Sequence, residues 1–218
     1  MGALSNYITS TQYHLHDSSF RFWSQTQLTQ WINEARNKVA GDTLCLRQLM
    51  TGITLPQGTE QYQVQATTQA AANYPVGSTT VQVMGITVYW NTLRIKLYDW
   101  SFTKLDAWTR SLQQFQQTPF AFARMGVLAV YIAPVPQQAY TSDWECAITP
   151  QPLVSDSTTE VLVQPFTEAV PYYAAYKAKI NQQQLGEAEY FMRLYMREVK
   201  VANRTFITRV IPSAYDVD

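Results

Sequence analysis

The sequence predicts an α+β protein with an N-terminal helical hairpin, a strand-rich middle insertion, a C-terminal helical hairpin and an extended C-terminal tail. Three observations predict this order. Apolar residues recur at three- and four-residue spacing near the N-terminus. Beyond Leu46 the sequence becomes rich in Thr, Val, Ile and Tyr, with Pro and Gly at turns. Helical spacing returns from Thr167, so we expect the two hairpins to pack together as a helix bundle.

The same transitions divide the chain into four expected segments. The N-terminal helical hairpin covers residues 1–48, and a strand-rich domain with one helix covers 49–160. The C-terminal hairpin covers 161–205 and packs on the first, and residues 206–218 form the extended tail.

The first hairpin is predicted by two apolar stripes and a helix cap. The first helix ends near Asp17, and Ser24 with Gln27 forms a capping-box pattern at the start of the second. Gly41 is expected to end the second helix. The apolar positions are Leu4, Tyr7, Ile8 and Leu15 in the first helix and Leu28, Trp31, Ile32, Ala35 and Val39 in the second.

The middle of the chain is predicted to form strands joined by short turns. We expect 80–90 to pair with 93–98, 120–124 to pair with 127–132, and a further strand at 141–149. Residues 65–79 have little apolar side chain to bury and are expected to form a protruding loop. One helix interrupts the strands. Ser101 caps it, and its inner face carries Leu105, Trp108, Leu112 and Phe115.

The C-terminal hairpin starts near Thr167, with Pro171 in its first turn, and Gly186 is expected to break it. The last helix should reach about Thr205, with an inner stripe of Ala188, Phe191, Tyr195, Val199 and Ala202. Beyond it, 207–218 has neither helical nor strand periodicity but keeps several apolar residues. Docking onto a partner and a frayed terminus are both compatible with that composition.

Charge and hydropathy exclude several classes of function. Charged residues make up 15% of the chain, the net charge is zero and the pI is about 6.7, whereas DNA-binding domains usually carry a basic stripe. Sequence-specific DNA binding is therefore not expected, although a channel wall past which DNA slides is compatible. No apolar run is long enough to span a membrane, and no secretory signal is evident, so we expect synthesis in the cytoplasm. The Gln- and Thr-rich surface suits either a subunit covered by neighbours or an ordinary polar surface.

Candidate metal and catalytic residues are few. His14, His16 and Asp17 lack a second set of ligands elsewhere, so a solvated helix end is the favoured interpretation. Cys45 and Cys146 are expected to be buried thiols. The chain contains no G-x-S-x-G, G-x-G-x-x-G or G-x-x-x-x-G-K pattern. We therefore expect no metal, no cofactor and no catalytic residue.

Two alternative functions remain open at this point. Asp143 and Glu145 lie two apart on an expected strand and could serve a cell-wall hydrolase, although a solvated edge beside a buried face is favoured. Exposed aromatic side chains could instead stack on sugars, as in a carbohydrate-binding module. The candidates for such a platform are Tyr74, Tyr89, Trp90, Tyr98 and Trp100.

Two blocks of sequence carry a resemblance to a known family. The first comprises His16-Asp17-Ser18, Phe22-Trp23-Ser24, and Leu28 with Trp31-Ile32-Asn33-Glu34-Ala35-Arg36-Asn37. The second covers 163–179, with Pro165-Phe166-Thr167 and Val170-Pro171-Tyr172-Tyr173-Ala174-Ala175-Tyr176, and continues into Gly186-Glu187-Ala188-Glu189. In these blocks and in its order of elements, the chain resembles the head-to-tail adaptor proteins of short-tailed bacteriophages, also called head completion or connector proteins.

The resemblance implies a non-enzymatic structural protein of the virion at the head–tail junction. Such proteins form a ring, commonly of twelve copies, beneath the portal protein, and packaged DNA passes through its channel. The ring presents a platform to a tail nozzle or tail tube protein, and no membrane is involved. The C-terminal segment grips the portal, so the expected portal contacts here are Arg209, Ile211, Pro212 and Tyr215.

Overall fold

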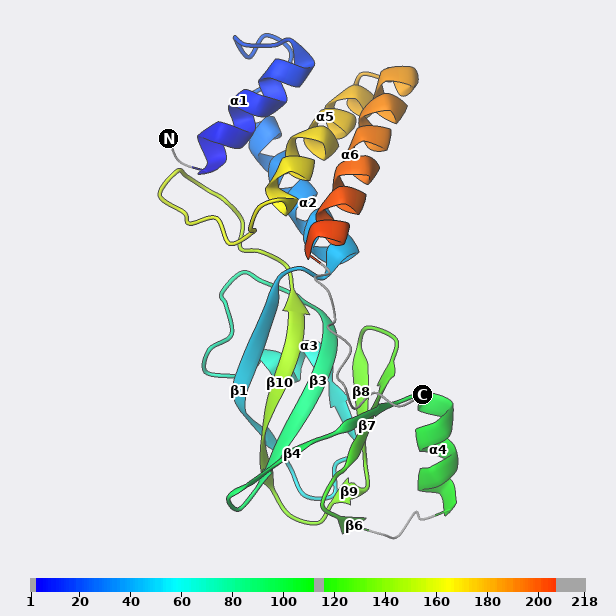
Figure 1. Ribbon diagram of the computed structural model, residues 1–218. Helices are drawn as coiled ribbons and strands as arrows, with labels where there is room; N and C mark the ends of the chain where they lie inside the picture. The colour runs from blue at the N-terminus through cyan, green and yellow to red at the C-terminus, as the bar shows by residue number, and fades with distance from the viewer. Residues whose placement is uncertain (1–2, 112–115, 207–218) are drawn as a thin grey trace. The chain divides into compact units, whose positions relative to one another are not determined.

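The computed structural model describes residues 3–111 and 116–206 of the chain (Figure 1). These residues form a mixed α+β protein with two compact units. The helical unit combines the N-terminal residues up to Cys45 with the chain from Pro152 onward, and the strand unit comprises Leu46–Gln151. The boundaries between the units thus fall after residues 45 and 151. The sequence pattern predicted boundaries after residues 48 and 160. Leu112, Phe115 and the expected tail 207–218 lie outside the described residues.

Four long helices build the helical unit: α1 (Ala3–Leu15), α2 (Gln25–Thr43), α5 (Val170–Asn181) and α6 (Leu185–Phe206), with a short 3₁₀ turn at Phe166–Ala169 before α5. Helix α5 contacts α1, α2 and α6 (Figure 1). Its residues Ala174, Ala175 and Ala178 are fully buried. Because alanine side chains are small, three neighbouring helices can approach α5 closely from different sides.

The helix boundaries follow local signals with two exceptions. The capping box of Ser24 and Gln27 is confirmed, and so are the first-turn position of Pro171 and the buried stripe of α6. The expected stop at Gly41 was wrong, because α2 continues to Thr43 and ends where Leu44 adopts the left-handed conformation. The expected break between the last two helices is present, but it precedes Gly186 and lies between Asn181 and Leu185. Gly186 lies inside α6, and the left-handed residue in the connection before α6 is Gln183.

The segment that follows Gln151 belongs with the helices. Leu153 and Leu162 are buried in the helical core. Asn33 on α2 donates from Nδ2 to the Leu153 carbonyl at 3.0 Å, and its Oδ1 accepts from the Leu153 N–H at 2.8 Å. These contacts hold the start of the segment against α2, so residues 152–160 group with the helical unit.

The strand unit contains two four-stranded sheets. The first has the order β1 (Arg47–Leu55), β10 (Tyr140–Ile148), β3 (Thr80–Trp90), β4 (Leu93–Lys96), and the second has the order β2 (Gln61–Gln63), β8 (Ala129–Ala133), β7 (Ala121–Met125), β5 (Tyr98–Trp100). Strands β6 (Gln116–Gln117) and β9 (Val135–Pro136) form a parallel pair. Both expected hairpins are confirmed, as β3–β4 and β7–β8, although Tyr98 belongs to β5 and not to β4.

Alternating side chains of β7 and β8 serve two cores. Phe122 and Ile132 join the main core, which receives side chains from both sheets, whereas Ala123 and Ala133 point to the other face. There helix α4 (Phe102–Ser111) packs with Leu105 buried against the two alanines. The predicted helix is therefore confirmed, and the backbone N–H of Lys104 donates to the Ser101 hydroxyl at its start.

The expectation of a protruding loop at 65–79 was wrong for 65–69, whereas residues 70–79 contain no helix or strand. Helix α3 (Val64–Gln69) occupies its start, and Val64, Thr68 and Ala71 are buried. Thr68 and Thr80 share a hydrogen bond of 2.8 Å between their hydroxyls, and Asn73 donates to the Leu49 carbonyl. Polar side chains bury well here because their hydrogen bonds are satisfied, which hydropathy alone does not reveal.

Candidate interaction surfaces

The turn after α1 is solvated at most of its positions, as expected, but it is built around one buried carboxylate. Asp17 is buried and its carboxylate accepts hydrogen bonds from the backbone N–H groups of Arg21 at 2.8 Å, Phe22 at 3.0 Å and Trp23 at 3.3 Å. His14 instead stacks against Tyr172, with ring centroids 4.7 Å apart. Within residues 3–111 and 116–206, no group of His, Cys, Asp and Glu side chains is arranged to hold a metal ion. The carboxylate therefore fixes the chain reversal that leads into α2.

The Asp17 turn gives a pH-dependent prediction. Burial opposes ionisation of Asp17, but the N–H groups of Phe22, Arg21 and Trp23 together lower the pKa of this carboxyl below its usual value. A carboxyl whose pKa is lower in the folded than in the unfolded chain stabilises the folded state at pH values above its unfolded pKa of about 4. This stabilisation is lost as the pH falls through the pKa of the folded state. We expect Asp17→Asn to lower the urea midpoint at pH 7, and the difference from wild type to shrink below about pH 4.

Urea unfolding followed by circular dichroism at stepwise lower pH measures this difference. Glu189→Gln, at an exposed position of α6, is the matched control and should show no such change. A difference between wild type and Asp17→Asn that stays constant from pH 7 to well below the pKa of Asp17 would contradict the prediction.

Strand β10 is not an edge strand, so the expected solvated edge was wrong for Asp143, whereas the Glu145 side chain is 42% exposed. Strand β10 lies between β1 and β3 in its sheet. Asp143 is only 7% exposed and accepts hydrogen bonds from the Gly52 N–H and the Tyr89 hydroxyl. The hydrogen bond to Asp143 raises the pKa of Tyr89. Asp143 thus ties β1 and β3 to the central strand, which is a structural role.

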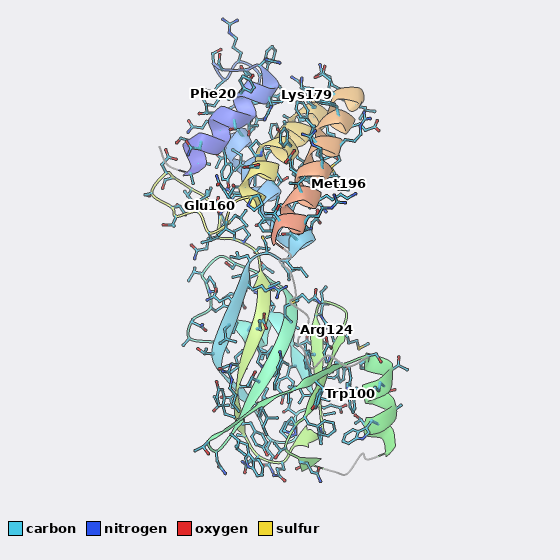
Figure 2. The ribbon with its side chains drawn as sticks, in the orientation of Figure 1. Phe20, Trp100, Arg124, Glu160, Lys179 and Met196 are labelled. Atoms are coloured by element: carbon cyan, nitrogen blue, oxygen red, sulfur yellow. The ribbon has the colours of Figure 1, made fainter. Side chains whose placement is uncertain are left out.

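The aromatic residues considered as a sugar platform are spread over two sheets. Trp90 ends β3, whereas Tyr98 and Trp100 lie on β5. The hydroxyls of Tyr74 and Tyr89 are engaged in internal hydrogen bonds. Trp100 packs edge-on against Trp108 and Phe120, and Figure 2 shows it beside α4. These positions give the carbohydrate-binding alternative no support.

The two cysteines differ in burial. Cys146 is fully buried, and burial raises the pKa of its thiol to about 12, which keeps it protonated at neutral pH. Cys45 is only half-buried, so the expectation that both are buried was wrong for this residue.

The helical unit contains a cavity of about 610 Å³ that the sequence did not indicate. Its walls come from α1, the segment before α5, the start of α5 and one residue of α6. The carboxylates of Glu160, Glu168 and Glu198 line it, together with the rings of Tyr7, His14 and Tyr172. Burial and the proximity of His16 lower the pKa of His14, so His14 is uncharged at neutral pH. The cavity is therefore both acidic and aromatic.

The three carboxylates differ in how they are compensated. Glu160 accepts from Arg36 Nε at 2.9 Å and from Nη2 at 2.7 Å (Glu160 is labelled in Figure 2). Glu198 accepts from Arg197 at 2.9 Å. Glu168 is exposed, and across the described residues no cation lies within ion-pair distance of it. Glu168 therefore gives the cavity an uncompensated negative charge.

A buried hydroxyl also faces this cavity. Tyr7 is 7% exposed and lines the cavity, yet its hydroxyl has no hydrogen-bond partner of normal geometry in the described part of the chain. Burial, and then the nearby Glu160 carboxylate, raise the pKa of Tyr7 far above its usual value. The hydroxyl is therefore neutral and lies close to the Glu160 carboxylate in the cavity wall.

The outward face of α6 is basic. Arg193, Arg197, Lys200 and Arg204 are all exposed and follow one another at four-, three- and four-residue spacing, which places them on one helix face. Apolar side chains flank this face, and Figure 2 labels one of them, Met196. The exposed flanking residues are Leu185, Tyr190, Met196 and Val201. We name the four cations the basic face of α6. Helical spacing of cations in the sequence is the signal that could have found it.

The expected portal contacts cannot be placed. Arg209, Ile211, Pro212 and Tyr215 lie outside the described residues, so their assignment stays a prediction.

A family model provides the decisive comparison. The model of the SU10 adaptor protein family matches residues 3–210, which covers both units. The chain belongs to the SU10 adaptor protein family. It is therefore a structural adaptor protein of a bacteriophage particle, and the resemblance found in the sequence is confirmed at this level.

SU10 adaptor membership implies a non-enzymatic role among other components of the virion. The sequence matches no curated protein. Among the described helices, none is both long enough and apolar enough to span a bilayer.

Proposed function

We propose that this adaptor is a head-to-tail connector of the type found in short-tailed phages, which forms a ring of commonly twelve copies between portal and tail. The ring extends the DNA channel and gives a tail nozzle or tail tube protein its attachment platform. The single observation that carries the proposal is the family match across residues 3–210. It extends over the helical unit, the strand unit and part of the C-terminal segment.

The residues that carry the resemblance have structural roles that support the proposal. Asp17 and Ser24 fix the turn and the cap between α1 and α2. Asn33 and Arg36 hold the segment from Leu153 to Glu160 against α2. The matched sequence blocks therefore specify the frame of the helical unit, which is the part that packs helical hairpins into a ring-building bundle in similar proteins.

Net charge is compatible with a channel that DNA passes through. The chain has no net charge, so a ring of copies does not hold DNA phosphates by a strong overall field. DNA therefore passes through the channel without sequence-specific binding. The isolated chain remains mainly monomeric at physiological salt until the portal brings copies together.

Native mass spectrometry of the protein mixed with portal rings tests the proposal. We expect a defined complex with one adaptor per portal subunit, and mainly monomer without portal. Portal rings alone serve as the mass reference. If no complex formed while the chain bound glycans or cleaved cell wall, the connector proposal would give way to one of those activities.

Truncation after Thr205 tests the tail assignment. Removal of Arg209, Ile211, Pro212 and Tyr215 should weaken portal binding by about tenfold or more, because it removes several apolar anchors and one cation. Circular dichroism of the shortened chain checks that the two units remain folded. Unchanged affinity for portal would show that the tail does not dock there.

A further inference from the structure

We propose that the acidic cavity of the helical unit receives the basic face of α6 from a neighbouring copy of the chain. This inference rests on the proposed ring and names the surfaces by which its subunits contact each other. It requires that the cavity can bind cationic side chains and that the basic face of α6 can supply them. It also requires that the basic face cannot reach the cavity of its own chain.

The cavity has the chemistry of a site for arginine or lysine side chains. Glu168 supplies a negative charge without an ion-pair partner among the described residues. Tyr7 adds a buried hydroxyl close to the Glu160 carboxylate, and Tyr172 adds an aromatic ring. Carboxylates with aromatic faces bind guanidinium and ammonium groups through charge-assisted hydrogen bonds and cation–π contacts. An anion would instead meet the charges of Glu160, Glu168 and Glu198.

The basic face offers a matching row of cations. Four exposed cations cover residues 193–204, which is about 16 Å of helix. Only Arg197 forms an ion pair among the described residues, with Glu198. Arg193, Lys200 and Arg204 are left facing solvent, and exposed Tyr190 and Val201 lie beside them. Cations with apolar flanks are the composition expected of a subunit interface.

The two surfaces lie on different sides of the same helix. Glu198 lines the cavity, and at 100° per residue it lies about 120–160° around α6 from Arg193, Lys200 and Arg204. These cations therefore cannot turn into the cavity of their own chain. A contact that joins two different surfaces of identical subunits is head-to-tail, and such a contact closes into a ring when the rotation allows it.

A second copy fits this pairing better than DNA does. Both halves of the contact are present on the same chain, and each compensates the charge of the other, so the chain as a whole can remain neutral. Duplex DNA would cover only the basic face and would leave Glu168 without a cation. Binding of DNA by the basic face is thus the competing outcome of the experiment.

Charge reversal in the full-length chain tests the contact. One variant carries Glu168→Lys, and the other carries Arg193→Glu with Arg204→Glu. Sedimentation velocity at low salt and high protein concentration should show weak self-association of the wild type, reduced by about tenfold or more in each variant. An equal mixture of the two variants should recover wild-type association, because each surface then meets its opposite charge. Arg94→Glu, at an exposed position on β4, is the control and should behave like wild type.

Three outcomes overturn the inference: variants that associate like wild type, a mixture that associates no better than its components, or a wild type that shows no association under these conditions. Loss of duplex DNA binding by the α6 variant with unchanged self-association also overturns it and assigns the basic face to phosphate. Portal binding is measured separately by native mass spectrometry. If the chain binds portal but the charge-reversal variants do not behave as expected, only the proposed interface is wrong. If the variants behave as expected but the chain does not bind portal, the connector proposal is wrong.

Discussion

Replacing Glu160 with alanine is expected to lower the free energy of unfolding by about 3–5 kcal/mol. Arg36 is 1% exposed and donates to both carboxylate oxygens of Glu160, at 2.9 Å and 2.7 Å. Without Glu160 the buried guanidinium keeps its hydrogen bond to Asn33 but loses the two charge-assisted hydrogen bonds to the carboxylate. Glu160 also accepts from the Leu162 N–H, so the same substitution frees the segment that covers the helical core.

Urea unfolding followed by circular dichroism measures this loss. The double variant Arg36→Leu with Glu160→Leu should lose less stability than Glu160→Ala, because it removes the buried charge together with its partner. Glu168→Ala, an exposed carboxylate of the same cavity, should change the free energy by less than about 0.5 kcal/mol. A cost below about 1 kcal/mol for Glu160→Ala would show that water or another group compensates Arg36.

Local sequence signals predicted most helices and hairpins of the protein. The buried stripe of α6 follows from residues at three- and four-residue spacing, and the start of α2 follows from Ser24 and Gln27. The β3–β4 hairpin follows from an apolar run interrupted at Asn91, which has the positive φ that such a tight turn needs. In each case the residues that determine the element are close together in the sequence.

Long-range pairs explain most of what the sequence did not predict. Asn33 and Arg36 belong to the motif that resembled the family, but their partners Leu153 and Glu160 follow 120 and 124 residues later. Spacing along one helix contains no information on such partners. The cavity was missed for the same reason, since its walls come from α1, the segment before α5, α5 and α6.

Polar residues in the strand unit account for a second group of errors. Alternation of polar and apolar residues along β10 predicted that Asp143 faces solvent. However, β10 lies between two strands, and the Asp143 carboxylate accepts hydrogen bonds from Gly52 and Tyr89. The position of a strand within its sheet depends on pairing with strands elsewhere in the chain. Hydropathy therefore identified β10 as a strand without giving its place in the sheet.

Trp144→Ala should destabilise the strand unit by about 3–5 kcal/mol. Trp144 is 0% exposed on the central strand β10 and packs edge-on against Tyr62, with ring centroids 6.2 Å apart. Its indole N–H donates to the Ser142 hydroxyl, which in turn donates to the Ile53 carbonyl on β1. The substitution thus leaves a large cavity between the two sheets and removes one end of a hydrogen-bond chain that joins two strands.

The size of this effect depends on whether the core can collapse around the missing ring. Strands β1 and β3 pair with β10 along most of its length, and the core beside Trp144 contains residues from both sheets. The surrounding side chains and backbone can therefore relax little into the space left by the ring. Trp90→Ala, where the ring is 40% exposed at the end of β3, is the matched control and should cost about 1 kcal/mol or less. Urea unfolding of both variants measures the two costs. Equal losses for Trp144 and Trp90 would mean that the two sheets do not form the tightly packed core from which the prediction follows.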